Sequence, residues 1–306
     1  MGFGLSSLLR RILKEVRGGP EAAGTEIGGL HMPRRFLCAL FSALSLFLPP
    51  AAAEEPVILP ILMYHDVSFD HPGKDVVTPE ELRADLAWLR EAGYSPVTMA
   101  QVIACADGIS PLPPKPIVLS FDDGYTSAYD RVLPLLREMD MPIVLSVIAG
   151  SADEFSAYAP GKVRLAHAVW PQLRELADSG LVELQDHSYG LHRAQGSAWG
   201  CDRLPGESRS AYAERLAADV LLAQERIWEE TGRKCEVFTY PYGRYSAESE
   251  ELLRELGFRA TLTCDFGVNR ISGEEDCLFG LRRICRSHGA DLPALLEEAC
   301  HTVKWR

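Results

Sequence analysis

The sequence predicts an α/β protein built around a distorted (β/α) barrel of about seven units. From residue 56 onward, short apolar runs rich in β-branched residues alternate with longer amphipathic segments. This alternation is typical of parallel strands joined by helices. No G-x-G-x-x-G segment occurs, which favours a barrel over a dinucleotide-binding sheet. The 306 residues are enough for such a barrel, which takes roughly 250.

Short apolar runs along the chain are the expected strands. They are Val57–Tyr64, Ser95–Thr98, Ile117–Phe121, Ile143–Ile148, Val182–Gln185, Val237–Tyr240 and Ala260–Thr263. In barrels of this type the chemistry lies on the loops that follow the carboxyl ends of the strands. Polar residues directly after these runs are therefore the candidates for function.

Amphipathic segments between these runs are the expected helices. The clearest begins at Thr78–Glu81, where a capping threonine is followed by a proline and, at the third helical position, a glutamate. The others are Ala128–Met139, Val169–Ser179, Ser208–Thr231, Ala247–Leu256 and Leu292–Cys300. No internal repeat, low-complexity linker or second domain is visible.

Residues 32–53 have the pattern of an export signal. Arg34 and Arg35 precede the apolar run Phe36–Leu48, and Ala51–Ala53 forms a small-residue cleavage site. The apolar run is shorter than the roughly 20 residues that a membrane-spanning helix needs. We therefore expect a secreted or periplasmic protein with no stable membrane span. We interpret residues 1–31 as a gene-model extension ahead of Met32, and assign residues 54–306 to one domain.

Charge and cysteine content argue against two kinds of function, nucleic-acid binding and a cysteine-built metal site. With 31 basic and 43 acidic residues the formal net charge is −12, so nucleic acid is not an expected partner. In an oxidising compartment some cysteines can pair, for example Cys264 with Cys277. No C-x-x-C spacing occurs, so a cysteine-built zinc site is not expected. No feature of the sequence indicates an oligomeric state.

Two adjacent aspartates, Asp122 and Asp123, directly follow the apolar strand that ends at Phe121. Neighbouring carboxylates repel each other unless a cation or a proton separates their roles. One can then hold a metal ion while the other remains a base. A solvated turn, in which an aspartate caps the next helix, is the alternative, and this segment alone leaves both open.

Two histidines, His187 and His192, follow the expected strand that ends at Gln185. Through the turn at Gly190, both imidazoles can converge on one divalent ion. Two histidines with one carboxylate form a common ligand set for a hydrolytic metal, with positions left for water and substrate. A pair of surface histidines on a loop is the alternative, and it is weakened by the presence of Asp123.

Two further strand ends carry candidate residues. Tyr242 lies between Pro241 and Gly243, which would fix a backbone amide suited to an oxyanion hole and an aromatic wall suited to a sugar face. An ordinary Pro-Gly turn is the alternative. His65 leaves the first strand beside Asp66, where a lone histidine is often structural but is also placed to act as a general acid.

In this order, the segments resemble the polysaccharide deacetylase family, carbohydrate esterases that share the NodB homology domain. Phe121–Gly124 is similar to the first family motif, His187–His192 to the second and Tyr240–Gly243 to the third. The resemblance covers essentially all of residues 56–306 and implies a barrel of the NodB-homology type. The five-residue histidine spacing and Met63–Asp66 resemble a narrower branch, the biofilm poly-β-1,6-N-acetylglucosamine deacetylases, in which the motifs are circularly shifted.

This resemblance implies a metal-dependent hydrolase that removes N-acetyl groups from an N-acetylated polysaccharide and releases acetate. Asp123, His187 and His192 would bind one divalent ion, which is zinc by default, with nickel, cobalt or iron as alternatives.

The resemblance also assigns catalytic roles. Asp122 would be the base, His65 the general acid, and the amide of Tyr242 part of the oxyanion hole. Thr239 occupies the place of the usual arginine of the third motif, so Arg283 is the candidate that braces Asp122.

The substrate and some alternatives stay open. Loops 66–77, 149–168 and 193–207 are expected to set the substrate, and chitooligosaccharide, peptidoglycan or acetylated xylan are alternatives. A carbohydrate-binding protein without turnover and an amidase of a small nitrogenous ring are rivals from other classes. The complete set of candidate catalytic residues speaks against the first, and the export signal against the second. Asp66, Asp70 and Asp75 are candidates for an acidic rim of the cleft, and the alternative is that they only belong to a solvated acidic surface. Tyr64, Tyr189 and Tyr242 are expected to face sugar rings.

Overall fold

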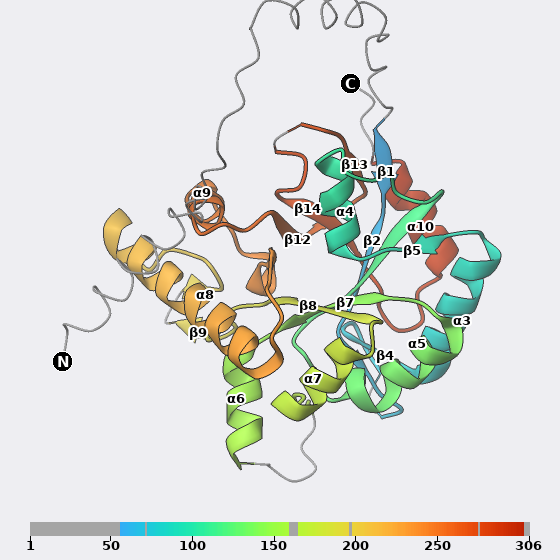
Figure 1. The fold of residues 1–306 in the computed structure, drawn as a ribbon, viewed down its shortest axis with the longest axis horizontal. Coiled ribbons are helices and arrows are strands. Elements are labelled where there is room, and N and C mark those ends of the chain that lie inside the picture. Colours follow the sequence, from blue (N-terminus) through green and yellow to red (C-terminus); the bar gives the residue numbers. More distant parts are fainter. Residues whose placement is uncertain (1–55, 71, 159–164, 196–197, 275, 303–306) are drawn as a thin grey trace, which may run out of the picture. The chain divides into compact units, whose positions relative to one another are not determined.

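Parallel strands close into a ring with helices around it, as the sequence predicts (Figure 1). The computed structural model describes residues 56–302 apart from 71, 159–164, 196–197 and 275. The ring order is β2 (Ile61–Tyr64), β14 (Leu281–Cys285), β12 (Ala260–Phe266), β11 (Val237–Thr239), β8 (Val182–Asp186), β7 (Ile143–Val147) and β6 (Pro116–Phe121). Pairing of β6 with β2 closes it, and the remaining strand of this 8-stranded sheet, β5 (Ser95–Pro96), pairs with β6 outside the ring. The barrel of about seven units is confirmed.

The predictions for the N-terminal segment lie outside the described residues. These are the extension at 1–31, the export signal at 32–53 with its cleavage site, and the domain start at residue 54. None of the helices in the described part of the chain is long and apolar enough to cross a membrane.

The first expected strand, Val57–Tyr64, is in fact two strands. Pro60 separates β1 (Val57–Leu59), which pairs antiparallel with β13 (Asn269–Ile271), from β2, which enters the ring. A proline has no N–H to give to a ladder, so a strand tends to break or change partner there.

The expected strand Ser95–Thr98 is wrong as a ring strand. Only Ser95–Pro96 pairs, and Thr98 instead caps the helix α4 (Met99–Ala106), with Gln101 completing a capping box. The ring position goes to β14, which the sequence analysis did not list among the strands. β14 contains Arg283, and it joins β12 to β2.

Most helices follow the sequence prediction closely. The structure has α3 (Pro79–Glu91), α7 (Trp170–Asp178), α8 (Arg209–Thr231), α9 (Ala247–Glu255) and α10 (Leu292–Cys300). The segment predicted as one helix over 128–139 is a π-helical turn, η1 (Ala128–Val132), followed by α5 (Leu133–Met139). Helix α6 (Ala149–Tyr158) was not predicted. Short elements complete the fold: β3 (Asp66–Val67), β4 (Val76–Val77), β9 (Ala194–Gln195), β10 (Ala198–Trp199) and η2 (Pro241–Gly243).

Alternation along the ring strands divides the core into two layers. Alternate residues such as Ile61, Val118 and Val144 belong to one buried cluster. Their neighbours in sequence, such as Leu62 and Leu119, belong to a second cluster that includes buried residues of the surrounding helices. This follows from the two-residue period of a strand, which sends successive side chains to opposite faces.

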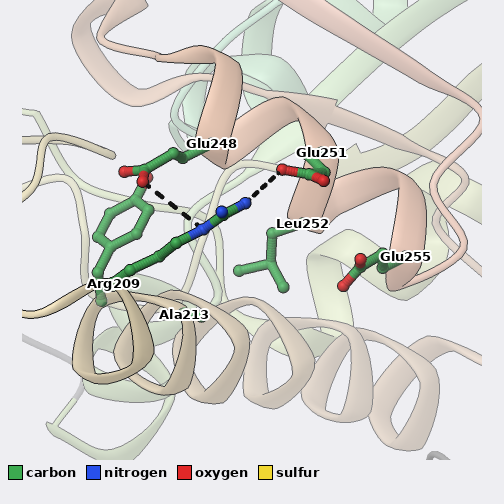
Figure 2. Close-up of a pocket in the computed structure, with 7 residues that line it drawn as sticks. Arg209, Ala213, Glu248, Glu251, Leu252 and Glu255 are labelled. Atoms are coloured by element: carbon green, nitrogen blue, oxygen red, sulfur yellow. Dashed lines mark hydrogen bonds and ion pairs between the residues drawn. The ribbon is translucent and has the colours of Figure 1, made fainter.

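Helices α8 and α9 pack on one another beside the ring. Arg209 at the start of α8 reaches two glutamates of α9, with its Nη2 at 2.7 Å from Glu251 and its Nε at 3.7 Å from Glu248 (Figure 2). Such exposed ion pairs contribute about 0–1 kcal/mol each. The buried contacts beneath them, among Leu216 of α8, Leu253 of α9 and other residues, are therefore the main source of stability at this interface.

Candidate active site

A cleft of about 840 Å³ opens at the carboxyl ends of the ring strands. Of the residues predicted for the site, all but one line this cleft: His65, Asp122, Asp123, His187, His192 and Tyr242. The remaining one, Arg283 on β14, contacts Asp122. The ring thus brings together residues that the chain separates widely, as expected for a parallel barrel.

Three potential metal-binding groups converge in the cleft. His187 Nε2 lies 3.4 Å and His192 Nε2 3.3 Å from Asp123 Oδ1. The ligand atoms of the three residues all lie within 4.8 Å of one another. Two imidazole nitrogens and one carboxylate oxygen suit zinc and the neighbouring divalent transition metals.

The environment of Asp123 fits a cation at this point. Its Oδ1 is buried and has no hydrogen-bond partner among the described residues. A buried carboxylate oxygen is costly to leave unpaired, and a metal ion would satisfy it. Burial opposes ionisation of Asp123, but the imidazoles of His187 and His192 outweigh it and lower the pKa of the carboxyl.

A backbone carbonyl orients His187. Its Nδ1 lies 2.8 Å from the carbonyl oxygen of Thr239 on β11, so Nδ1–H donates and the lone pair of Nε2 is available to coordinate a metal. The Thr239 hydroxyl is bound to Ser146 Oγ at 2.7 Å, which fixes this strand end in turn. Thr239, which stands in the place of the usual arginine of the third motif, therefore orients His187 through its backbone carbonyl.

The pKa values of the two imidazoles are shifted in opposite directions. Burial disfavours the charged form of His187, yet Asp123 and Asp122 outweigh it and raise its pKa, so positive charge is favoured at this point. For His192, burial and the neighbouring His187 lower the pKa to about 4. His192 is therefore neutral at pH 7, the form in which imidazole coordinates a metal.

Asp122 is held by Arg283 through two hydrogen bonds. Arg283 Nη1 donates to Oδ1 at 2.7 Å and Nη2 to Oδ2 at 2.8 Å, and both side chains are buried. Arg283 is itself fixed, because its Nε donates to the Thr263 carbonyl at 2.7 Å and Nη1 to Ser120 Oγ at 3.2 Å. Burial opposes ionisation of Asp122, but Arg283 outweighs it and lowers the pKa, so the carboxylate stays ionised.

His65 approaches Asp122 from the end of β2. Its Nε2 lies 3.9 Å from Asp122 Oδ2, and its side chain is 19% exposed, so it is reachable from the cleft. The strand end that carries it is anchored by a buried cluster, in which Tyr64 Oη donates to Asp85 at 3.0 Å and Arg286 Nε donates to the same carboxylate at 2.8 Å. The backbone N–H of Arg286 also donates to the Met63 carbonyl.

Tyr242 forms a wall next to His192. Its ring centroid lies 4.1 Å from that of His192, and its hydroxyl donates to the His192 carbonyl at 3.0 Å. The backbone of Tyr242 is left-handed, with φ of 58°, which is unusual for a bulky aromatic residue and is often found at functional sites. The part predicted for its amide in an oxyanion hole stays a prediction.

Trp199 lies beside the cleft, in contact with Tyr242, a position that the sequence did not predict. Its ring meets that of Tyr242 edge to face at 5.1 Å, and the two side chains are 46% and 41% exposed. A single tryptophan in a loop gives no signal of its own in the sequence. Its position becomes visible only when the chain brings residue 199 beside residue 242.

Other expectations about the cleft are corrected by the structure. Tyr64 is 1% exposed and cannot face a sugar, because it packs against Phe121 in the core. Tyr189 is half-buried, and its hydroxyl donates to Asp153. Asp66 and Asp75 line the cleft as expected, but Asp70 does not.

The pairing considered for Cys264 and Cys277 is wrong. All the cysteines of the described residues have free thiols. Cys264 lines the cleft with its Sγ 3.8 Å from Arg283 Nη2, whereas Cys277 Sγ donates to the Ser272 carbonyl. The two thiols thus have different neighbours.

Comparison with known proteins identifies relatives. A sequence model of the family described as polysaccharide deacetylase matches residues 110–261. Poly-beta-1,6-N-acetyl-D-glucosamine N-deacetylase of Escherichia coli strain K12 is 35% identical over 214 residues, which are 64% of this chain and 32% of that protein. The match thus spans about a third of the length of this curated relative.

Solved structures show the same similarity. A de-N-acetylase from Aggregatibacter actinomycetemcomitans superposes with a TM-score of 0.68 at 25% identity, covering 80% of this chain and 100% of that one. The deacetylase domain of BpsB from Bordetella bronchiseptica superposes with a TM-score of 0.61 at 30% identity, covering 78% and 98%.

Proposed function

The chain belongs to the polysaccharide deacetylase family, and on this premise we propose that it is a metal-dependent N-deacetylase of a poly-N-acetylglucosamine-type polysaccharide. One observation carries the proposal: three convergent ligand atoms lie beside Asp122, a buried carboxylate that Arg283 keeps ionised. A metal site next to a base is suited to hydrolysis of an amide, because the metal can activate a water molecule and the base can take its proton. The rest of the geometry fits this reading.

The convergence of three ligand atoms supports this place for the metal. Asp123 Oδ1 and the Nε2 atoms of His187 and His192 would hold one divalent ion, zinc by default, with nickel, cobalt or iron as alternatives. When bound, the ion would lower the pKa of a water molecule and polarise the acetamide carbonyl.

The chain's own groups then move the protons. Asp122 takes a proton from the attacking water, because Arg283 holds its carboxylate ionised and fixed. His65, next to Asp122, gives a proton to the departing amine as the carbon–nitrogen bond breaks. The products are acetate and a glucosamine unit. The amide of Tyr242 supports the oxyanion, a contribution worth roughly 3 kcal/mol in other enzymes.

The exposed aromatic rings support a sugar substrate. Tyr242 and Trp199 present apolar faces beside His192, where a pyranose ring can pack while its acetamide reaches the metal ligands. The printed name of the Escherichia coli relative supports poly-β-1,6-N-acetylglucosamine as the polymer. The pattern of residues 32–53 supports a secreted or periplasmic location.

The test is acetate release from purified polymers. We expect release from poly-β-1,6-N-acetylglucosamine, loss of release with a chelator, and recovery when zinc is added back. The panel includes chitooligosaccharide, peptidoglycan and acetylxylan. Release from one of these alone would replace the proposed substrate, and binding without any release would indicate a carbohydrate-binding protein.

A further inference from the structure

The two metal-site histidines lie on one short loop that has no regular structure of its own. This loop follows β8, and it carries His187 and His192 on either side of the segment Ser188–Gly190. Ser188 is fully buried and has a left-handed backbone, with φ of 73°. A conformation of this kind is disfavoured for a residue with a side chain, so the surroundings have to hold it.

The middle of the loop is held by a carboxylate on helix α8. Asp219 Oδ1 accepts a hydrogen bond from the Tyr189 N–H, and Oδ2 accepts one from the Gly190 N–H, both at 2.8 Å. A Cβ atom on Gly190 would lie 3.3 Å from this Oδ2, so the glycine allows the close approach. Hydrogen bonds to an ionised acceptor are roughly twice as strong as neutral ones.

The other side of the loop is held by the start of helix α6. The N–H groups of Ala149 and Gly150 donate to the carbonyls of Ser188 and Tyr189, at 3.1 and 3.2 Å. A Cβ atom on Gly150 would lie 2.3 Å from the Tyr189 oxygen, so this contact also depends on a glycine. The loop is therefore clamped between α6 and α8, which contact each other beside the ring (Figure 1).

Every N–H in the segment Ser188–Gly190 donates to an aspartate. The N–H of Ser188 donates to Asp186 Oδ1 at 2.7 Å, and the next two donate to Asp219. Asp219 alone comes from a distant part of the chain, so it fixes the loop relative to the barrel as well as its local turn.

We propose that Asp219 is a positioning residue of the metal site, which holds the loop so that both imidazoles converge on Asp123 before an ion binds. Asp219 is not among the residues that line the cleft, and it acts through the backbone between the two histidines. The inference rests on the proposed function, because it requires that this site bind a metal. Outer partners of this kind typically change metal affinity about 10–100-fold when they are removed.

A matched control is Asp153, which contacts the same loop residue, Tyr189. Asp153 on α6 also binds Tyr189, but through the side-chain hydroxyl at 3.2 Å, and it forms an ion pair with Arg226 of α8 at 2.8 Å. Asp153→Asn therefore weakens the contact between α6 and α8 without removing a hydrogen bond to the loop backbone. It reports what a loss of stability alone does to the site.

The experiment measures zinc affinity by competition with a chelator, and the visible absorption of the cobalt-loaded protein. In Asp219→Asn one carboxylate oxygen becomes an amide NH₂, which cannot accept a hydrogen bond from the loop. We expect zinc to bind about 10–100-fold more weakly and the cobalt spectrum to change, because the ligand geometry changes. Asp153→Asn is expected to lower the midpoint of thermal unfolding but to keep both readouts of the unmodified protein.

A second variant covers the case in which Asp219→Asn does not fold. Gly190→Ala places a methyl group 3.3 Å from the Asp219 oxygen, so it disturbs the same contact more gently. Weaker zinc binding in this variant is expected. Unchanged zinc affinity and cobalt spectrum in Gly190→Ala and in any folded Asp219→Asn would overturn the inference. So would an equal loss of affinity in Asp153→Asn.

Failure of the proposed function looks different. If the unmodified protein binds zinc no better than Asp123→Ala does, there is no metal site here, and the inference falls with it. If the unmodified protein binds zinc tightly and the Asp219 contact does not matter, only the inference falls.

Discussion

Arg283 grips both carboxylate oxygens of Asp122, at 2.7 and 2.8 Å, although 161 positions separate the two residues in the sequence. The pair joins β14, the last strand of the ring, to the end of β6. Asp122 is buried, and the guanidinium stabilises its ionised form there.

Replacing Arg283 by methionine should change the pH dependence of activity. Burial of Asp122 would then be opposed only by the nearby imidazoles of His187 and His65, so its pKa would rise, and the acidic limb of the rate profile would move to higher pH. Breaking a buried pair also costs about 3–5 kcal/mol of stability. The pH–rate profile and urea unfolding check both effects. Arg282→Met, at the exposed neighbouring position, is the control, and an acidic limb that stays in place would contradict the role of Arg283.

Asp123→Ala should abolish metal retention, because it removes the only carboxylate of the proposed ligand set. Metal content after dialysis measures this directly. Asp122→Asn is the matched variant at the neighbouring position. It should retain the metal and lose activity about 10²–10⁴-fold, as expected when a general base is removed. Undiminished metal content in Asp123→Ala would contradict the assignment of Asp123 as a metal ligand.

His65→Phe should remove the alkaline limb of the rate profile and most of the turnover. The reason is that the profile of an acid–base pair falls when the base gains a proton and again when the acid loses one. Metal content should stay that of the unmodified protein. A variant that loses its metal would show that His65 is a ligand and that the acid lies elsewhere.

Glu81 should make folding stability depend on acid pH. Burial opposes its ionisation, but hydrogen bonds from the N–H groups of Gly289 and Thr78 lower its pKa from 4.5 to about 2. A carboxyl with a lowered pKa stabilises the fold above pH 4.5, and this stabilisation is lost as the pH falls from there towards 2. The free energy of unfolding of Glu81→Gln, measured with urea between these pH values, should have a shallower slope against pH. Glu80→Gln, an exposed neighbour, should keep the slope of the unmodified protein.

Trp199→Ala should raise KM for the polymer by roughly tenfold with little change in kcat, because a stacked ring contributes to binding and not to the reacting bond. Steady-state kinetics on oligosaccharides of increasing length measure this. Trp228→Ala is the control, since Trp228 is also exposed but lies on helix α8, whereas Trp199 packs against the cleft residue Tyr242. An equal rise in KM for both variants would argue against a sugar contact at Trp199.

Much of the fold could be predicted because buried strands such as Ile143–Val147 are largely apolar runs. β14 could not be recognised in this way, since Arg282 and Arg283 interrupt its apolar pattern. Arg283 is charged and yet buried, which only its partner Asp122 explains, and partners distant in sequence leave no periodic signal. The same limit applies to Asp219, which looks like any acidic residue of a surface helix.

The site was easier to predict than its surroundings. Asp122, Asp123 and His187 directly follow strands, so local sequence carries their position. Trp199 and the burial of Tyr64 depend on how distant segments pack. Tyr64 points towards the helices because strand residues alternate, and a sequence of four buried residues, Ile61–Tyr64, hides that alternation.

Closure of the ring by β14 has a consequence for how the protein is made. Strands leave the ribosome in chain order. The edges of β2 and β12 that pair with β14 therefore stay unpaired until β14, which ends at Cys285, has been synthesised and inserted between them. Such edges invite pairing with other chains, and contacts between distant segments form slowly. The nascent chain therefore needs shielding until β14 has been synthesised. Since Asp122 meets its guanidinium only when β14 joins the ring, a chain stalled before residue 283 would be both aggregation-prone and inactive.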